Sequence, residues 1–261
     1  MMGPSDMQLT CDLSIGAPYT SLPQRARAIS ENWFSQNCYC LACESDQLIR
    51  TAPNTKATDF SCHTCGHSYE LKTFRKRPPK SLVDGAYGAL IARINASSAP
   101  TLCLLGRSES WQIESLTAIH SSFITPWVVE ERRPLRDHAR RAGWIGCNIR
   151  LDRIPADGEI AIVHDGMCVP KEKVRNNFRR FLPLAELSAN ERGWTTLTLA
   201  LIRTLGKQEF SLSDLYEREH RFAEAYAGNK HIRAKIRQQL QVLRDLGLLS
   251  FEGRGSYALR T

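Results

Sequence analysis

Two pairs of cysteines constrain this chain more than any other feature of its sequence. Cys40 and Cys43 are separated by two residues, and Cys62 and Cys65 repeat that spacing after a gap of eighteen residues. A two-residue spacer lets two thiolates from one tight turn reach the same Zn²⁺ ion, and two such turns complete a tetrahedral site. Four protein ligands leave no open position on the metal, so the spacing predicts a structural zinc.

Other residues nearby could also bind the metal. Cys38 could replace Cys40, and His63 or His67 could replace one of the cysteines. Gly66 follows the second pair, where such a turn often needs a positive φ. The remaining cysteines have no partner spacing, and we expect each to be a small core residue: Cys11, Cys103, Cys147 and Cys168. An odd total of nine argues against a disulfide framework.

Length and charge set broad limits. The chain has 261 residues, enough for two modest domains, and it has no apolar run near the roughly 20 residues that a membrane-spanning helix needs. The first residues lack the basic region and apolar core of a secretory signal. We therefore expect a cytoplasmic protein with no membrane partner. The net charge of +8 suits a polyanionic partner, although many basic proteins bind none.

The patterns of residues 1–185 indicate an α/β domain, because helical and strand patterns alternate along this part of the chain. The first 22 residues have few periodic features, and we expect a loose arm there. The other expected elements are helices over 24–34, 84–96 and 173–182 and strands over 101–106 and 158–166.

Residues 186–261 differ, and we expect a separate winged-helix domain. Ser188 and Glu191 form a capping-box pattern ahead of an apolar-periodic run, and two further helical patterns follow. Gly247 suits the end of the third helix. The last residues then have the pattern of a hairpin around residues 253–255. Three helices followed by a hairpin is the order of a winged helix.

The third of these helices has a buried side and a basic side. Ile232, Ile236, Leu240 and Leu243 fall on one stripe, which we expect to be buried. A basic helix followed by a basic hairpin tip suits the major groove and phosphates of DNA, and glutamine can pair with adenine. A solvated basic face, or a protein-binding winged helix, is the alternative. The residues expected to contact DNA are Lys230, His231, Arg237, Gln238, Gln241 and Arg254.

Acidic residues flank the second cysteine pair. If residues 67–73 form a strand, Glu70 and Lys72 point to the same face, and Asp59 lies in the apolar-leaning stretch before the cysteine turn. Two carboxylates can hold Mg²⁺, which polarises a phosphodiester and activates water, while Lys72 stabilises charge. This D…E-x-K pattern is common by chance. By residues alone, a charged strand face is the favoured interpretation.

Several stretches of the sequence resemble the DpnI family of methyl-directed restriction endonucleases, which cut GATC when its adenine is methylated. The similarity runs from about residue 25 to the C-terminus, and its strongest stretches occur in the same order as in the family. They are DGAY (84–87), ARRAGWIGCNI (139–149), RGWT (192–195), KIRQQLQVLRD (235–245) and GRGSY (253–257).

The resemblance implies a PD-(D/E)xK nuclease domain with an inserted zinc site, followed by a winged helix, and methyl recognition by both domains. It implies that Asp59, Glu70 and Lys72 are catalytic, with Asp59 and Glu70 on Mg²⁺. It also implies that the zinc ligands are Cys40, Cys43, Cys62 and Cys65. Trp144 lies in a similar stretch and could pack against the methyl groups, or it could be a core tryptophan.

We therefore expect a monomeric type II endonuclease that hydrolyses double-stranded DNA at GATC sites containing N6-methyladenine. The rival class is a non-catalytic, zinc-containing winged-helix regulator, which has no use for Asp59, Glu70 and Lys72. A nuclease for another modified base is a third possibility.

Overall fold

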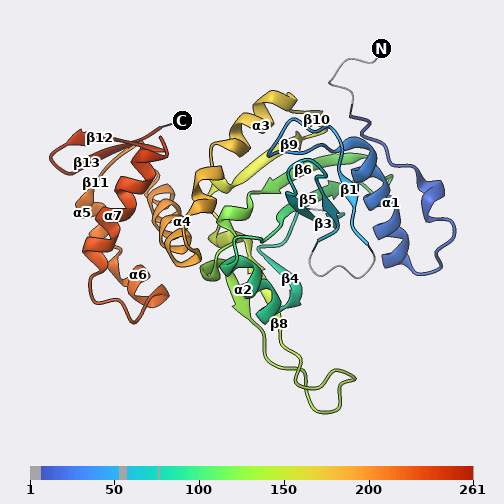
Figure 1. Ribbon diagram of the computed structural model, residues 1–261, viewed down its shortest axis with the longest axis horizontal. Helices are drawn as coiled ribbons and strands as arrows, with labels where there is room; N and C mark the ends of the chain where they lie inside the picture. The colour runs from blue at the N-terminus through green and yellow to red at the C-terminus, as the bar shows by residue number, and fades with distance from the viewer. Residues whose placement is uncertain (1–6, 53–57, 76, 261) are drawn as a thin grey trace. The chain divides into compact units, whose positions relative to one another are not determined.

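A computed structural model describes residues 7–52, 58–75 and 77–260 of the chain (Figure 1). The chain forms two compact units. The first comprises Met1–Pro79, Ser98–Ser121 and Glu159–Leu182, and the second comprises Lys80–Ser97, Ser122–Gly158 and Pro183–Thr261. No helix within the described ranges is long and apolar enough to cross a membrane.

The first unit contains a seven-stranded sheet in the order β1-β2-β3-β5-β6-β9-β10. Only β3 and β5 are parallel among these described strands; the other neighbours are antiparallel. The expected α/β core is therefore a mixed sheet, with both expected strands present. The strands are β1 Ile49–Arg50, β2 Phe60–Ser61, β3 Ser68–Phe74, β5 Thr101–Arg107, β6 Ile113–Ile119, β9 Glu159–His164 and β10 Met167–Cys168.

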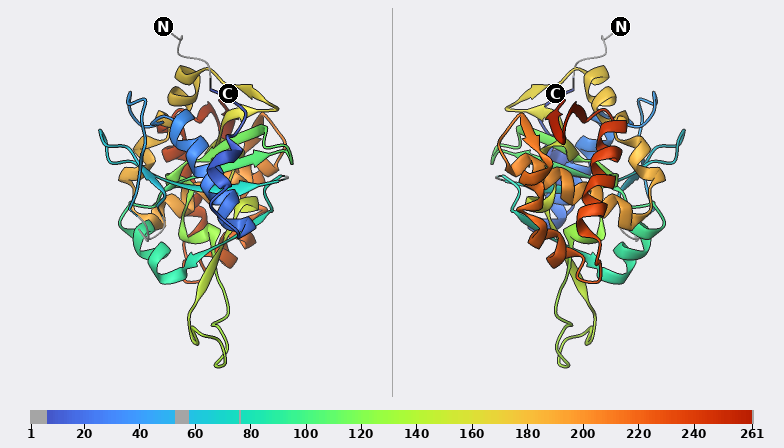
Figure 2. Two further views of the ribbon diagram at one scale, coloured as in Figure 1. Left: turned by 90° about the vertical axis from the view of Figure 1, so that its right-hand side faces the viewer. Right: turned by 90° about the vertical axis from the view of Figure 1, so that its left-hand side faces the viewer.

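Helices α1 (Leu22–Asn37) and α3 (Lys171–Arg179) supply much of the core of this unit. Trp33 and Phe34 of α1 and Phe178 of α3 are almost fully buried in one cluster with residues of the sheet. Figure 2 shows α1 lying over the strands. A proline in the first turn suits the start of α1, because the amide there has no partner within a helix. Both helices were expected at these positions.

The expectation of a loose N-terminal arm is wrong for residues 9–11. The N–H of Cys11 donates to the carbonyl of Trp111 at 3.1 Å, and the N–H of Ile113 donates to Leu9. Thr10 forms a β-bridge with Gln112. This segment is an added edge to the sheet, and its order comes from partners about a hundred residues away, which local periodicity does not reveal.

The second unit contains a three-stranded sheet in the order β4-β8-β7, with helix α2 (Tyr87–Asn95) following β4. The helix expected from residue 84 begins later, because Asp84 pairs with Cys147 and Ala86 pairs with Gly146 across the sheet. Pairing with a distant strand outweighs the local helical pattern there. The strands are β4 Ser81–Ala86, β7 Val129–Glu131 and β8 Gly146–Arg150.

The C-terminal part of this unit has helices followed by a hairpin, as expected. Ser188 and Glu191 form the predicted capping box, and Gly247 has φ +71° just beyond α7. A short strand, β11, joins the hairpin to make a third sheet ordered β11-β13-β12. The elements are α4 Ala189–Thr204, β11 Glu209–Ser211, α5 Leu212–Tyr216, α6 Glu219–Ala225, α7 Ile232–Asp245, β12 Leu249–Gly253 and β13 Ser256–Leu259.

Buried polar side chains organise the second unit. The Arg192 guanidinium donates to the carbonyl of Ile94 at 2.7 Å and to the hydroxyl of Ser97 at 2.9 Å, which ties α4 to the end of α2. The Thr195 hydroxyl donates to Gln239 at 2.7 Å, which ties α4 to α7. These bonds help to explain why residues 80–97 cluster with the C-terminal helices. A domain boundary at residue 185 stays a prediction.

Short 3₁₀ helices complete the connections. They are η1 Leu13–Gly16, η2 Ser121–Phe123, η3 Pro126–Val128, η4 Leu151–Arg153, η5 Ala156–Gly158 and η6 Leu182–Glu186. Three of the four unpaired cysteines are buried as expected, but Cys168 is exposed because it lies on the edge strand β10.

Candidate metal centre, acidic face and nucleic-acid interface

The two cysteine pairs come together in the first unit. The sulfurs of Cys40, Cys43, Cys62 and Cys65 all lie within 4.8 Å of one another. Cys40 Sγ and Cys65 Sγ are 3.5 Å apart, and Cys43 Sγ and Cys62 Sγ are 3.6 Å apart. Four thiolates at zinc–sulfur distances of about 2.3 Å from a tetrahedral ion lie about 3.8 Å from one another. The cluster therefore fits a zinc ion.

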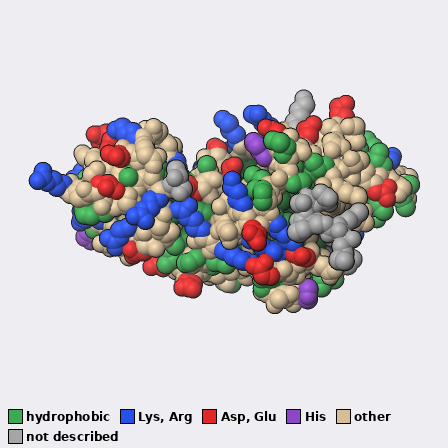
Figure 3. Space-filling view, turned by 90° about the horizontal axis from the view of Figure 1, so that it is seen from above, with side chains coloured by type: hydrophobic (Ala, Val, Ile, Leu, Met, Phe, Trp, Pro, Cys, Tyr) green, Lys and Arg blue, Asp and Glu red, His purple; other side chains and the backbone are tan. Residues whose placement is uncertain are grey.

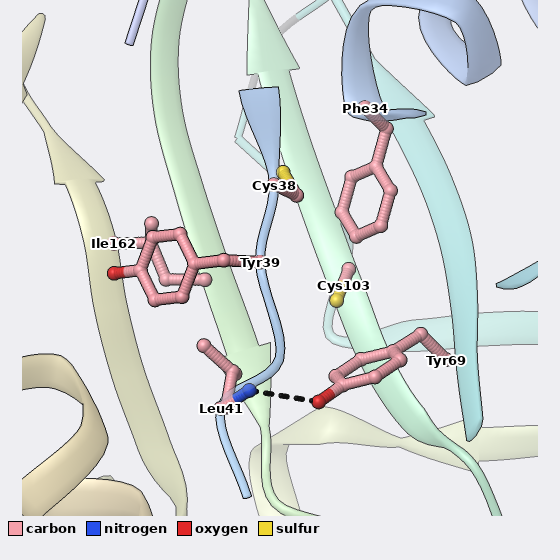
Figure 4. Close-up of a pocket in the computed structure, with 7 residues that line it drawn as sticks. All are labelled: Phe34, Cys38, Tyr39, Leu41, Tyr69, Cys103 and Ile162. Carbon is pink, nitrogen blue, oxygen red and sulfur yellow. Dashed lines mark hydrogen bonds between the residues drawn. The ribbon is translucent and has the colours of Figure 1, made fainter. Parts of the chain in front are cut away.

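The alternative ligands lie in other environments. His67 Nε2 is 2.8 Å from the Thr101 hydroxyl, and burial lowers the pKa of His67 to about 4. Cys38 lines a small apolar pocket with Cys103 and Phe34 (Figure 4). Within the described ranges, neither Cys38, His63 nor His67 joins the cysteine cluster.

The backbone of the second cysteine turn favours thiolate. Gly66 has φ +74°, and its N–H donates to the Cys62 carbonyl at 2.9 Å, which closes the turn. Burial by itself raises the pKa of Cys62, but hydrogen bonds from the N–H groups of Cys65 and Thr64, together with Cys43 and Ser45, lower that pKa to about 6. Zinc needs deprotonated sulfur, which these N–H groups favour at Cys62, whereas burial raises the pKa of Cys65 in the same turn.

The first cysteine turn is held by α3. The Arg175 guanidinium donates to the carbonyls of Cys40 at 3.1 Å and Ser45 at 2.9 Å. It also donates to Glu44 at 2.8 Å and Asp46 at 3.0 Å. Arg175 thereby binds two carbonyls of the turn, of which that of Ser45 also accepts from the Cys40 N–H at 3.0 Å, and it places a positive charge beside the cysteine cluster.

Tyr69 connects the first cysteine turn to strand β3. Its hydroxyl accepts a hydrogen bond from the Leu41 N–H at 2.9 Å and lies 3.3 Å from Cys40 Sγ (Figure 4). Because Tyr69 is the residue before Glu70, the metal cluster and the acidic residues share one strand. A change in the cysteine cluster can therefore move the acidic residues through strand β3.

The three expected catalytic residues lie on neighbouring backbone segments. Phe60 pairs with Tyr69, so one step further along that register Asp59 lies across from Glu70. The Leu71 N–H donates to Asp59 Oδ2 at 2.9 Å, which orients this carboxylate. Lys72 Nζ is 2.6 Å from Glu70 Oε1, and Glu70 is only 7% exposed. Two acids and an ammonium thus share one face of the β2–β3 hairpin.

Helix α1 adds residues that the sequence reading missed. Glu31 is buried and binds Arg27 and Arg50, and Arg27 Nη2 also lies 3.9 Å from Asp59 Oδ1. The i,i+4 spacing of Arg27 and Glu31 on a helix was the one available signal, but it is common on exposed surfaces. Only the fold places this pair beside Asp59.

The expected DNA-contacting residues on α7 and just before it are all on the surface of the second unit. Lys230, His231 and Arg237 are exposed, as are both expected adenine-reading glutamines, Gln238 and Gln241. Ile236, Leu240 and Leu243 are buried as expected, while Ile232 is half-buried. Figure 3 shows Lys and Arg side chains over the C-terminal helices and hairpin, at the left of the view.

The hairpin tip presents an arginine. Gly253, Arg254 and Gly255 have φ values of +93°, +50° and +77°. The left-handed values at Arg254 and Gly255 match the two central residues of a type I′ turn. Arg254 is exposed at this tip, where the expected phosphate contact requires it.

Trp144 is half-buried in the second unit, just before β8. The Arg141 guanidinium carbon lies 4.6 Å from the centroid of its ring. A Cβ atom added to Gly146 would lie 2.8 Å from two ring carbons of Trp144. The indole therefore rests on a glycine and is not enclosed in the core, so the core interpretation of Trp144 is not supported.

A four-cysteine cluster that fits zinc and a basic helix followed by a hairpin are features of metal-binding proteins with a DNA-binding domain. Residues 190–259 match the Dam-replacing HTH domain of DpnI, which indicates DNA binding. Residues 7–187 match the Dam-replacing family of DpnI. The chain belongs to the DpnI family, and this membership points to a restriction endonuclease.

Proposed function

We propose that this protein is a methyl-directed type II endonuclease that acts as a monomer on double-stranded DNA. In this proposal residues 1–185 form a PD-(D/E)xK nuclease domain with a structural zinc on the four cysteines, and residues 186–261 form a winged helix. The observation that carries the proposal is the acidic face, where Asp59 lies across from Glu70 and Lys72 is 2.6 Å from Glu70 in a DpnI-family chain.

The residues of the acidic face fit Mg²⁺. Asp59 and Glu70 would hold the ion, since carboxylate oxygens are the ligands that Mg²⁺ prefers. When bound, Mg²⁺ polarises a phosphate and lowers the pKa of a bound water. The Leu71 N–H keeps the Asp59 carboxylate oriented. Lys72 carries its ammonium beside Glu70, where it can neutralise charge that develops on the phosphate.

We propose that the target is GATC containing N6-methyladenine. Methylation removes one N6 donor hydrogen, so a reader of the methyl group works by apolar contact and shape. A pocket filled by a methyl group gains on the order of 1 kcal/mol relative to an empty one. Trp144 is a half-buried aromatic ring of the second unit, and Gln238 and Gln241 on α7 can pair with adenine.

The test is digestion of a GATC plasmid, methylated or unmethylated, with and without Mg²⁺. We expect cleavage only of methylated plasmid and only with Mg²⁺. A Lys72→Ala variant should bind the same DNA but cut it at least a hundredfold more slowly. If wild type cuts both plasmids equally, methyl direction is wrong, and if it binds but cuts neither with Mg²⁺ or Mn²⁺, the non-catalytic regulator is the correct class. A panel of duplexes with other modified bases tests the third possibility.

A further inference from the structure

Two arginines surround one buried carboxylate beside the acidic face, and the proposed function uses none of these three residues. Glu31 of α1 is only 4% exposed. Arg27 Nε donates to Glu31 Oε1, and Nη2 of Arg50, on strand β1, donates to Glu31 Oε2. We call Arg27, Glu31 and Arg50 the arginine–glutamate cluster. Because a buried carboxylate needs such partners, the three side chains hold one another in place.

The arginine–glutamate cluster carries a net positive charge. One arginine would neutralise Glu31, so the second leaves one positive charge in excess. The side chains of Arg27 and Arg50 are 67% and 56% exposed, so much of each faces solvent. Each oxygen of the Glu31 carboxylate already accepts a hydrogen bond from one arginine. Glu31 therefore acts as an anchor for two cations.

Arg27 also approaches Asp59 on the side that the backbone leaves available. The Leu71 N–H donates to Asp59 Oδ2 at 2.9 Å, whereas Arg27 Nη2 lies 3.9 Å from Asp59 Oδ1. That distance is too long for a hydrogen bond. Among the residues that the structure describes, Glu31 alone accepts a hydrogen bond from Arg27. A phosphate on the Oδ1 side of Asp59 would therefore meet a guanidinium that still has N–H groups to donate.

The backbone ties this cluster to the strand that leads from Asp59. Arg50 lies on β1, which pairs with β2, and the Thr51 N–H donates to the Asp59 carbonyl at 2.9 Å. Through Arg50, Glu31 connects α1 to this strand pair. The direction of the Arg27 guanidinium is therefore set by the same framework that holds the acidic face.

We propose that Arg27 binds a non-bridging oxygen of the DNA phosphate held at the acidic face, and that Glu31 is the positioning residue that directs it. A guanidinium matches a phosphate because it can donate two parallel hydrogen bonds. A cation that is in place before the substrate arrives stabilises charge that develops on the phosphate without further reorganisation. This inference rests on the proposed function, since it takes DNA as the substrate and the acidic face as the place of hydrolysis.

The first test is a phosphate scan of DNA binding by the full chain with Mg²⁺, in a Lys72→Ala background that keeps the duplex intact. Each probe is a methylated GATC duplex in which an uncharged methylphosphonate replaces one phosphate. The variant is Arg27→Ala. The control is Arg25→Ala, because Arg25 is exposed two residues away on α1 and lies on the opposite side of the helix.

We expect one methylphosphonate to weaken binding by the parent and by Arg25→Ala about tenfold, which is the effect of losing one charged hydrogen bond. The same probe should weaken binding by Arg27→Ala much less, because its partner on the protein is already missing. A purely structural role of Arg27 would lower the affinity for all probes alike and would single out no phosphate.

Single-turnover cleavage of methylated plasmid, without the Lys72 substitution, tests the anchor. Arg27→Ala should cut at least tenfold more slowly than Arg25→Ala, and Arg27→Lys should recover part of the rate, since lysine restores the charge but not the planar fork. Glu31→Gln should slow the wild type but add no further loss to Arg27→Ala, because Glu31 acts through Arg27. Urea unfolding identifies any loss of folding in Glu31→Gln, and the scan with Arg27 variants does not depend on that substitution.

The inference is overturned if every methylphosphonate affects Arg27→Ala and Arg25→Ala equally, or if these two variants cut at the same rate. If that happens while wild type cuts methylated plasmid, the proposed function stands and this inference alone fails. If wild type binds the duplex but does not cut it, the proposed function fails, and a methylphosphonate effect that requires Arg27 would still support the phosphate contact. If wild type binds no DNA, both proposals fail.

Discussion

Replacing Arg175 with methionine should loosen the metal centre and the fold around it. The side chain of Arg175 is 7% exposed and donates to the carbonyls of Cys40 and Ser45. Hydrogen bonds from a charged donor contribute about 1.5 kcal/mol each at the lower end of their range, so the loss of two costs about 3 kcal/mol. Its partners Glu44 and Asp46 are 75% and 67% exposed, and these ion pairs add little.

Arg179→Met is the matched control. Arg179 lies one turn further along α3, its side chain is 32% exposed, and its main-chain bond to Ala42 is longer at 3.3 Å. We expect it to cost less than about 1 kcal/mol. The assays are urea unfolding of the zinc-loaded protein and the rate of zinc transfer to a chromogenic chelator. If both variants lose the same stability and release zinc equally fast, the proposed role of Arg175 at the cysteine turn is wrong.

Two further predictions concern pH and methyl readout. Burial, together with the nearby His67, lowers the pKa of His120 to about 3. His120 therefore stays neutral in the folded protein, whereas the same histidine in the unfolded chain takes up a proton below about pH 6.5. The free energy of unfolding therefore falls by about 1.4 kcal/mol per pH unit as the pH drops from about 6.5 towards 3. A urea series should show a shallower acid loss for His120→Gln than for wild type; parallel curves would contradict this. Gly146→Ala would put a Cβ 2.8 Å from the Trp144 ring, so the ring must move. We expect the affinity ratio of methylated to unmethylated duplex to fall several-fold, and an unchanged ratio would remove Trp144 from methyl readout.

The arrangement of the first unit suggests why a structural metal lies next to an acidic face. Strand β3 carries Tyr69, which contacts Cys40 of the cysteine cluster, and the next residue is Glu70. Asp59 lies just before β2, and β2 leads into Cys62. A zinc ion would therefore close the hairpin at its end and hold the register that sets Asp59 across from Glu70. Removal of the metal should affect the acidic face through this register.

Several features followed from sequence because their causes are local. The C-x₂-C spacing brings two sulfurs to one turn, and the four sulfurs form one cluster. Ser188 and Glu191 are three residues apart, so their capping box depends only on the start of α4. The stripe of Ile236, Leu240 and Leu243 is buried because helical geometry alone puts these residues on one face.

Other features depended on partners far away in the chain. Residues 84–86 have a helical pattern but pair with β8, and residues 9–11 pair with 111–113. Arg192 and Gln239 are buried because they meet Ile94 and Thr195 across helix contacts. A local sequence pattern does not predict such contacts, because buried polar groups form hydrogen bonds with partners that become neighbours only when the chain folds.

By itself, the sequence determined the set of four cysteines, the helices and hairpin of the C-terminal part, and the basic side of α7. From the residues alone, Asp59, Glu70 and Lys72 were a charged strand face, and only the resemblance of the whole chain to a nuclease family indicated a catalytic role. The tertiary structure decided that Asp59 lies across from Glu70, that Arg27 and Glu31 lie beside them, and that Arg175 holds the cysteine turn. The physical reason is the sequence separation of the interacting residues. The cysteine spacing and the helix cap involve residues a few positions apart, whereas strand register and buried charge depend on which distant segments pack together.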